Sequence, residues 1–560
     1  MTPLFPSPLQ SAFHPELRTI EQRFVWAYKR SSAMMLATSL TTCICLWLNA
    51  TSQYNVISGF GVFTGFVILV DYLQVITWFA ACALIVSRCN LKGLERLCPT
   101  LCPATDGSVA TRPSTAFMRD RLAPALHRAR WPLVLLSLAM TAGGIVLAVS
   151  LFQEPEGMEA FHAEHPVTQY ARLSAAQYGD LSEKRPRAAL VYGLASPAVR
   201  FPQSLQIYDE ADADYQQDME PRYADAFDFG PAGQAQIVAE CEAAQGSEGL
   251  MHGGRGYCLL NELRAHDYAA FPYASEAALR AALEAFGRSE RYEQLRRNFS
   301  KLEKLSAFVP DGDHGLKAVW HSFNMTLGRG SRLSPQAVRP HYDGWRGLAG
   351  EGAFSASREF YWMDTVLGVT YAALENVFVA IGASCGVIAI VTGNLITPLL
   401  ATLSIVSVVA WTLAAVFLCG YAFDMFAAIL VVMVVGLAVD YSVHFSHLYQ
   451  ISEGTRYERA QGALHGVGVS ILSGALTTGL AGVPLLFAHL KFYTMAGTFL
   501  VFVALFGVLF AFLQLIPMLM CFGPEGSCGE LSAIWRGLRR KPTEPAGLGQ
   551  KEAAAATAER

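Results

Sequence analysis

The sequence predicts a polytopic α-helical membrane protein with about eight transmembrane helices, a parallel pseudo-repeat and one α+β extracytosolic domain. Hydrophobic residues make up 52% of the 560 residues and charged residues only 16%, whereas a soluble chain has about 25% charged residues. Residues 153–369 carry 30 acidic and 21 basic side chains, and the remainder carries 16 and 21. An acidic compartment is therefore set apart from a basic, membrane-associated part. This composition argues against a soluble enzyme, a nucleic-acid binder and a disordered scaffold.

Apolar runs of roughly 20 residues are long enough to cross a bilayer. The sequence contains eight such runs, at about 33–49, 57–86, 131–152, 372–392, 395–418, 422–449, 466–488 and 493–521. The first run is short and rich in threonine and serine, which a helix tolerates because their hydroxyls bond to carbonyls one turn back.

Lys and Arg residues predict the orientation, because they concentrate in cytosolic loops. Lys and Arg residues precede the first run and recur in the segments 88–130, 456–459 and 536–541. Both termini are therefore expected in the cytosol, and no cleavable signal peptide is visible. The predicted organisation begins with a cytosolic amphipathic segment (1–31), the last two helices of a first repeat (32–87), a cytosolic linker (88–130) and one transmembrane helix (131–152). The extracytosolic domain (153–370), a five-helix transmembrane part of the second repeat (371–521) and a cytosolic tail (522–560) follow.

Sequons and cysteines agree with this orientation. Asn298 and Asn324 fall in the outer domain and are expected to carry N-linked glycans. Asn49 also starts a sequon on the outer side, but it sits too close to the bilayer to be a good acceptor. Cys241 and Cys258 are the two cysteines of the outer domain, and such a pair in an oxidising compartment is expected to form a disulfide.

An internal repeat is visible at an offset of 436 residues. Leu40-Thr41-Thr42 and Gly61-Val62-Phe63 return as Leu476-Thr477-Thr478 and Gly497-Thr498-Phe499. Each copy reads as a basic amphipathic helix, a hydroxyl-rich span, a short outer loop and a long span. Both copies enter from the cytosolic side, as in the parallel repeats of transporters. The counterpart of 422–449 would fall before residue 14, where Met1–Pro8 is no membrane helix, so the sequence suggests a lost first half or a fragment of a longer protein.

An ionisable group inside a predicted span is the main candidate for chemistry. Asp440 lies in the sixth span, where a carboxylate costs several kcal/mol unless it is paired, hydrated or protonated. Gly436, Asp440, His444 and His447 share one helical face, since they are spaced i, i+4, i+8 and i+11. Gly436 would let a neighbouring helix approach closely.

We expect the seventh span to face Asp440, with Ser473 and Thr477 at a similar depth. An acid, a histidine and hydroxyls at one depth can relay protons or bind sodium; the alternative is an Asp that only fixes helix packing. Asp71 is a second intramembrane acid, either lining a hydrated path or protonated among helices. The outer domain has no convincing catalytic motif, so we predict neither an enzyme nor a metal site or cofactor, apart from a coupling cation.

The chain resembles the Patched-related branch of the resistance-nodulation-division (RND) permeases, and within it the Dispatched family. The resemblance covers most of 20–525 and the last eight of the family's twelve spans, and it is carried by the repeat, Gly436-x-x-x-Asp440 and shorter segments at 70–78, 191–193, 342–345 and 521–524, together with the Cys241 and Cys258 pair. It implies a sterol-sensing-type membrane region and a ferredoxin-like outer domain. Asp71 stands where the resemblance leads us to expect Asn.

Such permeases couple cation flow through midmembrane acids to the movement of lipids, sterols or lipid-modified proteins, and the resemblance gives this coupling role to Asp440. The expected function is therefore movement or release of such cargo, with sodium or protons as the coupling cation. Two alternatives stay open: a sterol-sensing regulator without transport, and an incomplete fragment of a longer permease.

Overall fold

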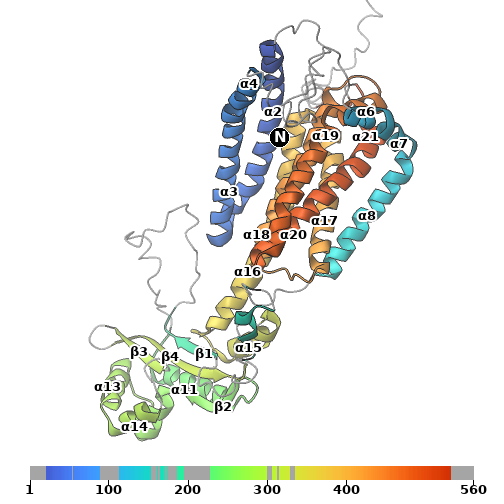
Figure 1. Cartoon of the computed structure of the whole chain (residues 1–560). Coiled ribbons are helices and arrows are strands. Elements are labelled where there is room, and N and C mark those ends of the chain that lie inside the picture. The colour runs from blue at the N-terminus through green and yellow to red at the C-terminus, as the bar shows by residue number, and fades with distance from the viewer. Residues whose placement is uncertain are drawn as a thin grey trace, which may run out of the picture.

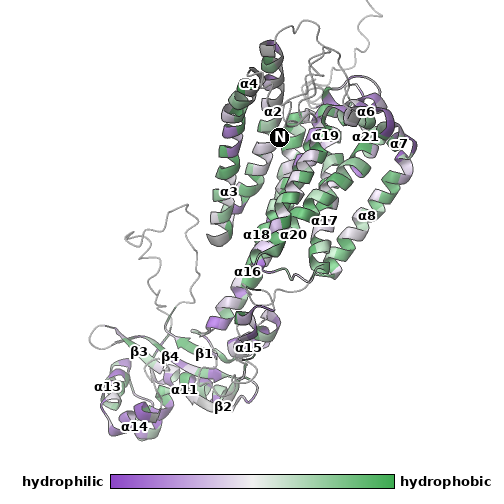
Figure 2. Cartoon of the chain, viewed as in Figure 1, coloured by the Kyte–Doolittle hydropathy of each residue, from purple (hydrophilic) through white to green (hydrophobic). Residues whose placement is uncertain are grey.

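The computed structural model describes residues 20–52, 55–88, 113–152, 161, 164–170, 173, 186–194, 227–298, 306–311, 315–327, 334–526 and 528–530. It consists of a long helical bundle and a smaller domain of strands and short helices at one end of that bundle (Figure 1). Hydrophobic residues cover the bundle helices, whereas hydrophilic residues concentrate on the small domain and at the opposite end of the bundle, around α6 and α7 (Figure 2).

Seven helical segments in the described part are long and apolar enough to span a membrane: Ile57–Cys82, Arg130–Ser150, Arg358–Thr392, Ile396–Leu418, Phe426–Ile451, Arg456–Phe487 and Lys491–Phe522. The chain is thus a polytopic helical membrane protein. The first of the eight expected spans is the exception. It belongs to α2 (Ile20–Trp47), whose apolar stretch covers only Met35–Thr51 when the following 3-10 turn is included. Basic and polar residues before Met35 shorten that apolar stretch.

The bundle consists of α2, α3 (Asn55–Gln74), α4 (Ala80–Arg88), α8 (Arg130–Ser150), α16 (Arg358–Thr392), α17 (Ile396–Leu418), α18 (Met425–Ile451), α19 (Arg456–Gly482), α20 (Lys491–Phe510) and α21 (Ile516–Phe522). The helix α18 lies at its centre and packs against α2, α16, α17, α19 and α20. Its central position explains why most of its side chains are buried, and it makes any polar residue on α18 expensive unless it finds a partner.

The repeat appears in the helix boundaries themselves. An offset of 436 carries the start of α2 at Ile20 onto the start of α19 at Arg456. It also carries all of α3, Asn55–Gln74, onto α20, Lys491–Phe510. A π-helical turn follows α3 at Val75–Phe79, and another follows α20 at the equivalent Ala511–Leu515. The helix boundaries therefore recur at the offset that the sequence predicts, and an irregular turn recurs with them.

The small domain holds a five-stranded antiparallel sheet in which β2 (Met251–Tyr257), β4 (Gly315–Met325), β1 (Arg187–Tyr192) and β5 (Ala353–Ala356) are neighbours in that order. The strand β3 (Ser306–Asp311) also pairs with β4. Around the sheet lie α11 (Pro231–Gly246), α12 (Leu259–His266), α13 (Glu276–Gly287), α14 (Glu290–Asn298) and α15 (Pro335–Leu348). The apolar faces of these elements form a core of their own, separate from the core of the bundle.

One continuous helix joins the two parts. α16 begins after Ser357, whose hydroxyl accepts from the amide of Glu359 as an N-cap, and it runs for 35 residues. Phe360 and Met363 in its first turns belong to the core of the small domain, and Val369 and later residues belong to the core of the bundle. The span expected at 372–392 is therefore only the second part of a longer helix.

Candidate functional site

Asp440 lies in the middle of α18, where the bundle is most crowded. Its side chain is partly buried, and its Oδ1 lies 3.3 Å from the Oγ1 of Thr42 on α2. Thr42 is itself buried and also bonds to the carbonyl of Thr38, at 3.1 Å. A carboxylate and a hydroxyl from two helices far apart in the sequence thus meet inside the bundle.

Gly436 allows this meeting, as its spacing from Asp440 predicts. A Cβ atom built on Gly436 would lie 3.1 Å from Cγ2 of Thr42, which is tighter than most carbon contacts in proteins. The absence of a side chain at Gly436 lets α2 approach α18 at the turn that precedes Asp440. The glycine and the acid therefore act on the same neighbouring helix, α2.

This contact corrects the expected facing helix. Ser473 on α19 donates to the carbonyl of Val469, and Thr477 donates to the carbonyl of Gly474. Thr477 is exposed. These hydroxyls satisfy carbonyls of their own helix, so they need no partner on α18, although α18 and α19 do pack together. The hydroxyl that Asp440 contacts comes from the first copy of the repeat instead.

Sequence reasoning missed Thr42 as a site residue, although the repeat contained the signal. Leu40-Thr41-Thr42 and Leu476-Thr477-Thr478 are equivalent, so a hydroxyl-rich stripe exists twice. Only the packing decides which copy reaches Asp440. His444, one helical turn beyond Asp440, is also partly buried, as expected for a residue on the same face of α18.

Asp71 lies apart from this site. Its side chain is exposed on α3, the span with the lowest buried share, 11%. Its repeat counterpart is Gly507 of α20, which packs against Tyr441 so closely that a Cβ would lie 2.5 Å from that ring. A side chain at position 507 would therefore separate α20 from α18, whereas position 71 faces open surface and accommodates one.

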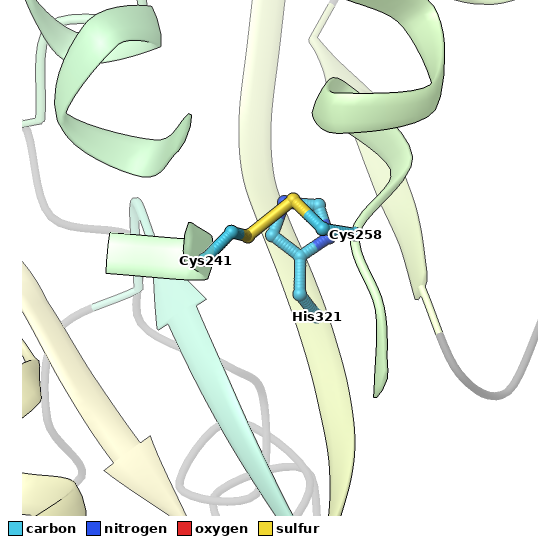
Figure 3. A group of neighbouring side chains, drawn as sticks. All are labelled: Cys241, Cys258 and His321. Carbon is cyan, nitrogen blue, oxygen red and sulfur yellow. A yellow bond between two sulfur atoms is a disulfide. The ribbon is translucent and has the colours of Figure 1, made fainter. Parts of the chain in front are cut away.

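The small domain contains the predicted disulfide between Cys241, within α11, and Cys258, just before α12. Both cysteines are buried, and the imidazole of His321 on β4 lies beside the two sulfur atoms (Figure 3). Three possible metal ligands gather here within 4.8 Å. Cysteine binds zinc as a thiolate, and the disulfide leaves neither Cys241 nor Cys258 as a thiolate, so His321 is the only one of the three that keeps a free ligand atom.

His321 is held by polar contacts on one side of its ring. Its Nδ1 lies 2.5 Å from Oγ of Ser306 and 3.4 Å from the amide nitrogen of Leu259. Its Nε2 has no hydrogen-bond partner among the described residues. Burial lowers the pKa of His321 to about 3, since the charged imidazolium would lose its hydration. The neutral ring therefore acts as a core residue packed on the disulfide.

The three sequons differ in their surroundings. Asn49 is 1% exposed, and its Oδ1 accepts a hydrogen bond from Nδ2 of Asn376 on α16 at 3.0 Å. Asn324 lies in β4, where its Oδ1 accepts from the guanidinium of Arg187. Asn298 ends α14, and its side chain lies outside the described residues. The buried position of Asn49 adds a packing reason for expecting it to stay unmodified.

Comparisons with known proteins point to one family. A model described as the sterol-sensing domain of SREBP cleavage-activation matches residues 11–102. The mouse (Mus musculus) protein dispatched homolog 1 is 23% identical over 582 residues, covering 90% of this chain and 36% of that protein. Its human (Homo sapiens) counterpart is 28% identical over 185 residues, covering 32% of this chain and 12% of that protein. The chain thus spans about a third or less of the length of these relatives.

A solved structure shares the fold. The hedgehog release protein Disp from the water bear Hypsibius dujardini matches with a TM-score of 0.61 at 15% identity, covering 92% of this chain and 61% of that one. The chain and that structure thus share the fold of a polytopic helical membrane protein, with a helical bundle and a small domain joined here by the continuous helix α16. The resemblance of the chain to the Dispatched family, predicted from the sequence, is therefore confirmed.

Proposed function

We propose that this chain moves or releases lipid, sterol or lipid-modified cargo, driven by cation movement coupled through Asp440. The contact between Asp440 and Thr42 carries the proposal. A carboxylate inside a bundle is costly, and this one lies where a first-copy helix and the central helix α18 cross. A change in its charge would therefore act directly on how α2 and α18 pack.

The hydrogen atoms of the pair explain how it could exist in two states. Thr42 has one hydroxyl hydrogen and two acceptors within reach, the Thr38 carbonyl and the Asp440 carboxylate. When Asp440 is protonated, it can donate to Thr42 while Thr42 donates to Thr38. When Asp440 is ionised, either Thr42 turns toward it and leaves Thr38, or a cation takes the place of the proton. A proton and a sodium ion are therefore both reasonable coupling ions.

The cargo proposal comes from the family. The water bear relative is described as a hedgehog release protein, and the family resemblance extends the cargo class to lipids, sterols and lipid-modified proteins. Residues 153–369 would lie outside the cell or in a lumen with both termini cytosolic, because basic residues flank the other loops. We also propose a ferredoxin-like outer domain, since β3, β4, β1 and β5 are neighbours in the order that a split β-α-β arrangement produces.

A sterol-sensing regulator without transport is the second candidate. The sterol-sensing match covers α2, α3 and α4, and α3 presents a broad exposed apolar face that includes Phe63, Phe66 and Val70. A planar lipid could bind such a face and change the packing of α2 without any cargo movement.

Reconstituted vesicles separate the two candidates. The full chain would be assayed for movement of a fluorescent sterol or lipidated peptide under a sodium gradient, a proton gradient or neither. We expect gradient-dependent movement that Asp440→Asn abolishes, with unchanged expression and elution. Asp71→Asn provides the matched comparison, because it removes an intramembrane acid that lies away from α18. Movement that is unchanged in Asp440→Asn would refute the coupling role. Binding of a photoreactive sterol without any movement would favour the regulator.

A further inference from the structure

The helical segment that precedes α8 has one face fixed to the bundle. It comprises α6 (Pro113–Phe117), a π-helical turn at Met118–Leu122 and α7 (Ala123–Arg128). It lies at the end of the bundle opposite the small domain (Figure 1). Met118, Ala123 and Leu126 are buried, and Gln461 of α19 donates to the carbonyl of Arg119 at 3.0 Å. This face is therefore held against α19.

The opposite face exposes two arginines that have no acidic partner among the described residues. Phe117, Arg121 and Arg128 are exposed, and the two arginines, seven residues apart, lie about 10 Å apart along the helix. Arg119 is already paired with Asp120 at 2.8 Å. Neither Arg121 nor Arg128 has an ion-pair partner in the part of the chain that the structure describes. Their guanidinium groups are thus available to an external anion.

Aromatic side chains place this face at the level of lipid headgroups. Trp131, in the first turn of α8, is 52% exposed, and its ring meets the ring of Phe522 edge-on at 5.8 Å. Exposed tryptophans at the ends of spans mark the boundary between hydrocarbon and headgroups. Arg128 lies three residues before Trp131. The hydrophilic α6 and α7 sit directly beyond the hydrophobic α8 (Figure 2), so the arginines lie next to the bilayer surface.

We propose that the outward face of α6 and α7 binds the anionic headgroup of a membrane phospholipid through Arg121 and Arg128. Guanidinium groups donate paired hydrogen bonds to phosphate oxygens, and basic residues beside a span attract anionic lipids. A headgroup bound here would contact the segment that leads into α8. In the chain, α8 in turn connects this segment to the outer domain. The interaction is separate from cation coupling at Asp440 and does not depend on it.

Spin-labelled lipids test the proposal on the full chain. The protein is reconstituted in nanodiscs of phosphatidylcholine that contain spin-labelled phosphatidylserine or spin-labelled phosphatidylcholine, and the motionally restricted fraction is measured. We expect preferential association of phosphatidylserine. Replacing both arginines (R121Q/R128Q) should weaken that preference by about fivefold for each arginine, as expected for charges near an anionic surface. Lysine at both positions (R121K/R128K) should keep most of it.

The matched control removes two exposed arginines from α14 of the outer domain (R296Q/R297Q), which are distant from the bundle end, and should leave the preference unchanged. An undiminished preference for phosphatidylserine in R121Q/R128Q would overturn the proposal. So would equal losses in the glutamine and lysine variants, because the effect would then not follow charge. Binding of millimolar inorganic phosphate to the arginines without any preference for phosphatidylserine would also overturn it, since the arginines would then hold a free anion only.

Discussion

Thr42 on α2 and Asp440 on α18 are 398 residues apart in sequence, and their side-chain oxygens lie 3.3 Å apart. Thr42 belongs to the first copy of the repeat, and α18 directly precedes the second copy. The polar pair can therefore form only after α2 and α18 have packed together. The contact therefore depends both on the packing of α2 against α18 and on the charge of the Asp440 carboxyl group.

Replacing Thr42 by valine should impair coupling without unfolding the protein. Valine keeps the shape of threonine but has no hydroxyl to donate to or accept from Asp440. We expect cargo movement to need a higher cation concentration, by roughly tenfold if one hydrogen bond to a charged group of about 1.5 kcal/mol is lost. The measurement is the cation dependence of initial rates in vesicles.

Thr41→Val is the matched control for that variant. The hydroxyl of Thr41 bonds to the carbonyls of Ala37 and Thr38 on its own helix, and among the described residues it forms no hydrogen bond to α18. Its loss should leave the cation dependence unchanged. Equal effects of both variants would mean that threonine supports α2 only structurally.

The disulfide between Cys241 and Cys258 should stabilise the small domain. It closes a loop with a sequence separation of 17, for which the chain-entropy relation predicts about 3 kcal/mol. The double variant Cys241→Ser with Cys258→Ser should lower the urea midpoint of this domain and leave the bundle assembled. Peptide mapping without reductant checks the bond directly, and recovery of both residues as free thiols would contradict it.

His321 should make the small domain sensitive to acid. Its pKa is lowered from 6.5 to about 3 by burial, so below pH 6.5 the unfolded chain binds a proton that the folded domain refuses. The free energy of unfolding should then fall by about 1.4 kcal/mol per pH unit as the pH drops from 6.5 toward 3. Urea unfolding followed by near-UV circular dichroism measures this slope. In His321→Gln the part of the slope due to this residue should vanish, and an unchanged slope would exclude it as the cause.

Glycan attachment tests the orientation. If the basic loops are cytosolic, Asn298 and Asn324 face the lumen during synthesis and Asn49 stays bare, since its side chain is bonded to Asn376. Replacing Asn298 and Asn324 by Gln should remove every glycosidase-sensitive mobility shift in a eukaryotic membrane. A remaining shift that disappears only with Asn49→Gln would place the outer end of α2 further from the bilayer. Protease cleavage within 88–130 from the outside would reverse the orientation.

Periodicity, hydropathy and the repeat were enough to predict the bundle from the sequence. The offset of 436 places Lys491 and Phe510 at the boundaries of α20 that correspond to those of α3. Hydropathy could not predict where α16 begins, because its first turns are polar on one face and pack into the small domain through Phe360 and Met363. How deeply each helix is buried depends on all of its neighbours, so the sequence of a single helix does not predict it.

The candidate site was only half visible in the sequence. Asp440 and Gly436 stand out because a charge and a small residue inside a span are each unusual. Thr42 does not stand out, since threonine is common in apolar helices and bonds to its own backbone. Whether Asp440 contacts Thr42 or the hydroxyls of α19 depends on which helix packs against Gly436. Only the three-dimensional packing of the bundle determines that neighbour.

The unbroken helix α16 couples the orientation of the small domain to the position of the bundle helices that it contacts. Thirty-five residues correspond to a rod about 52 Å long, with one end embedded in the small domain and the other ending beside the turn at Gly393. A rigid rod of that length that pivots by 5° about one end displaces the other by about 4.5 Å, close to the rise of one helical turn. A small tilt of the small domain would thus move the far end of α16 sideways against α17 and α18. The distance between a spin label in the small domain and one on α17 would report this tilt.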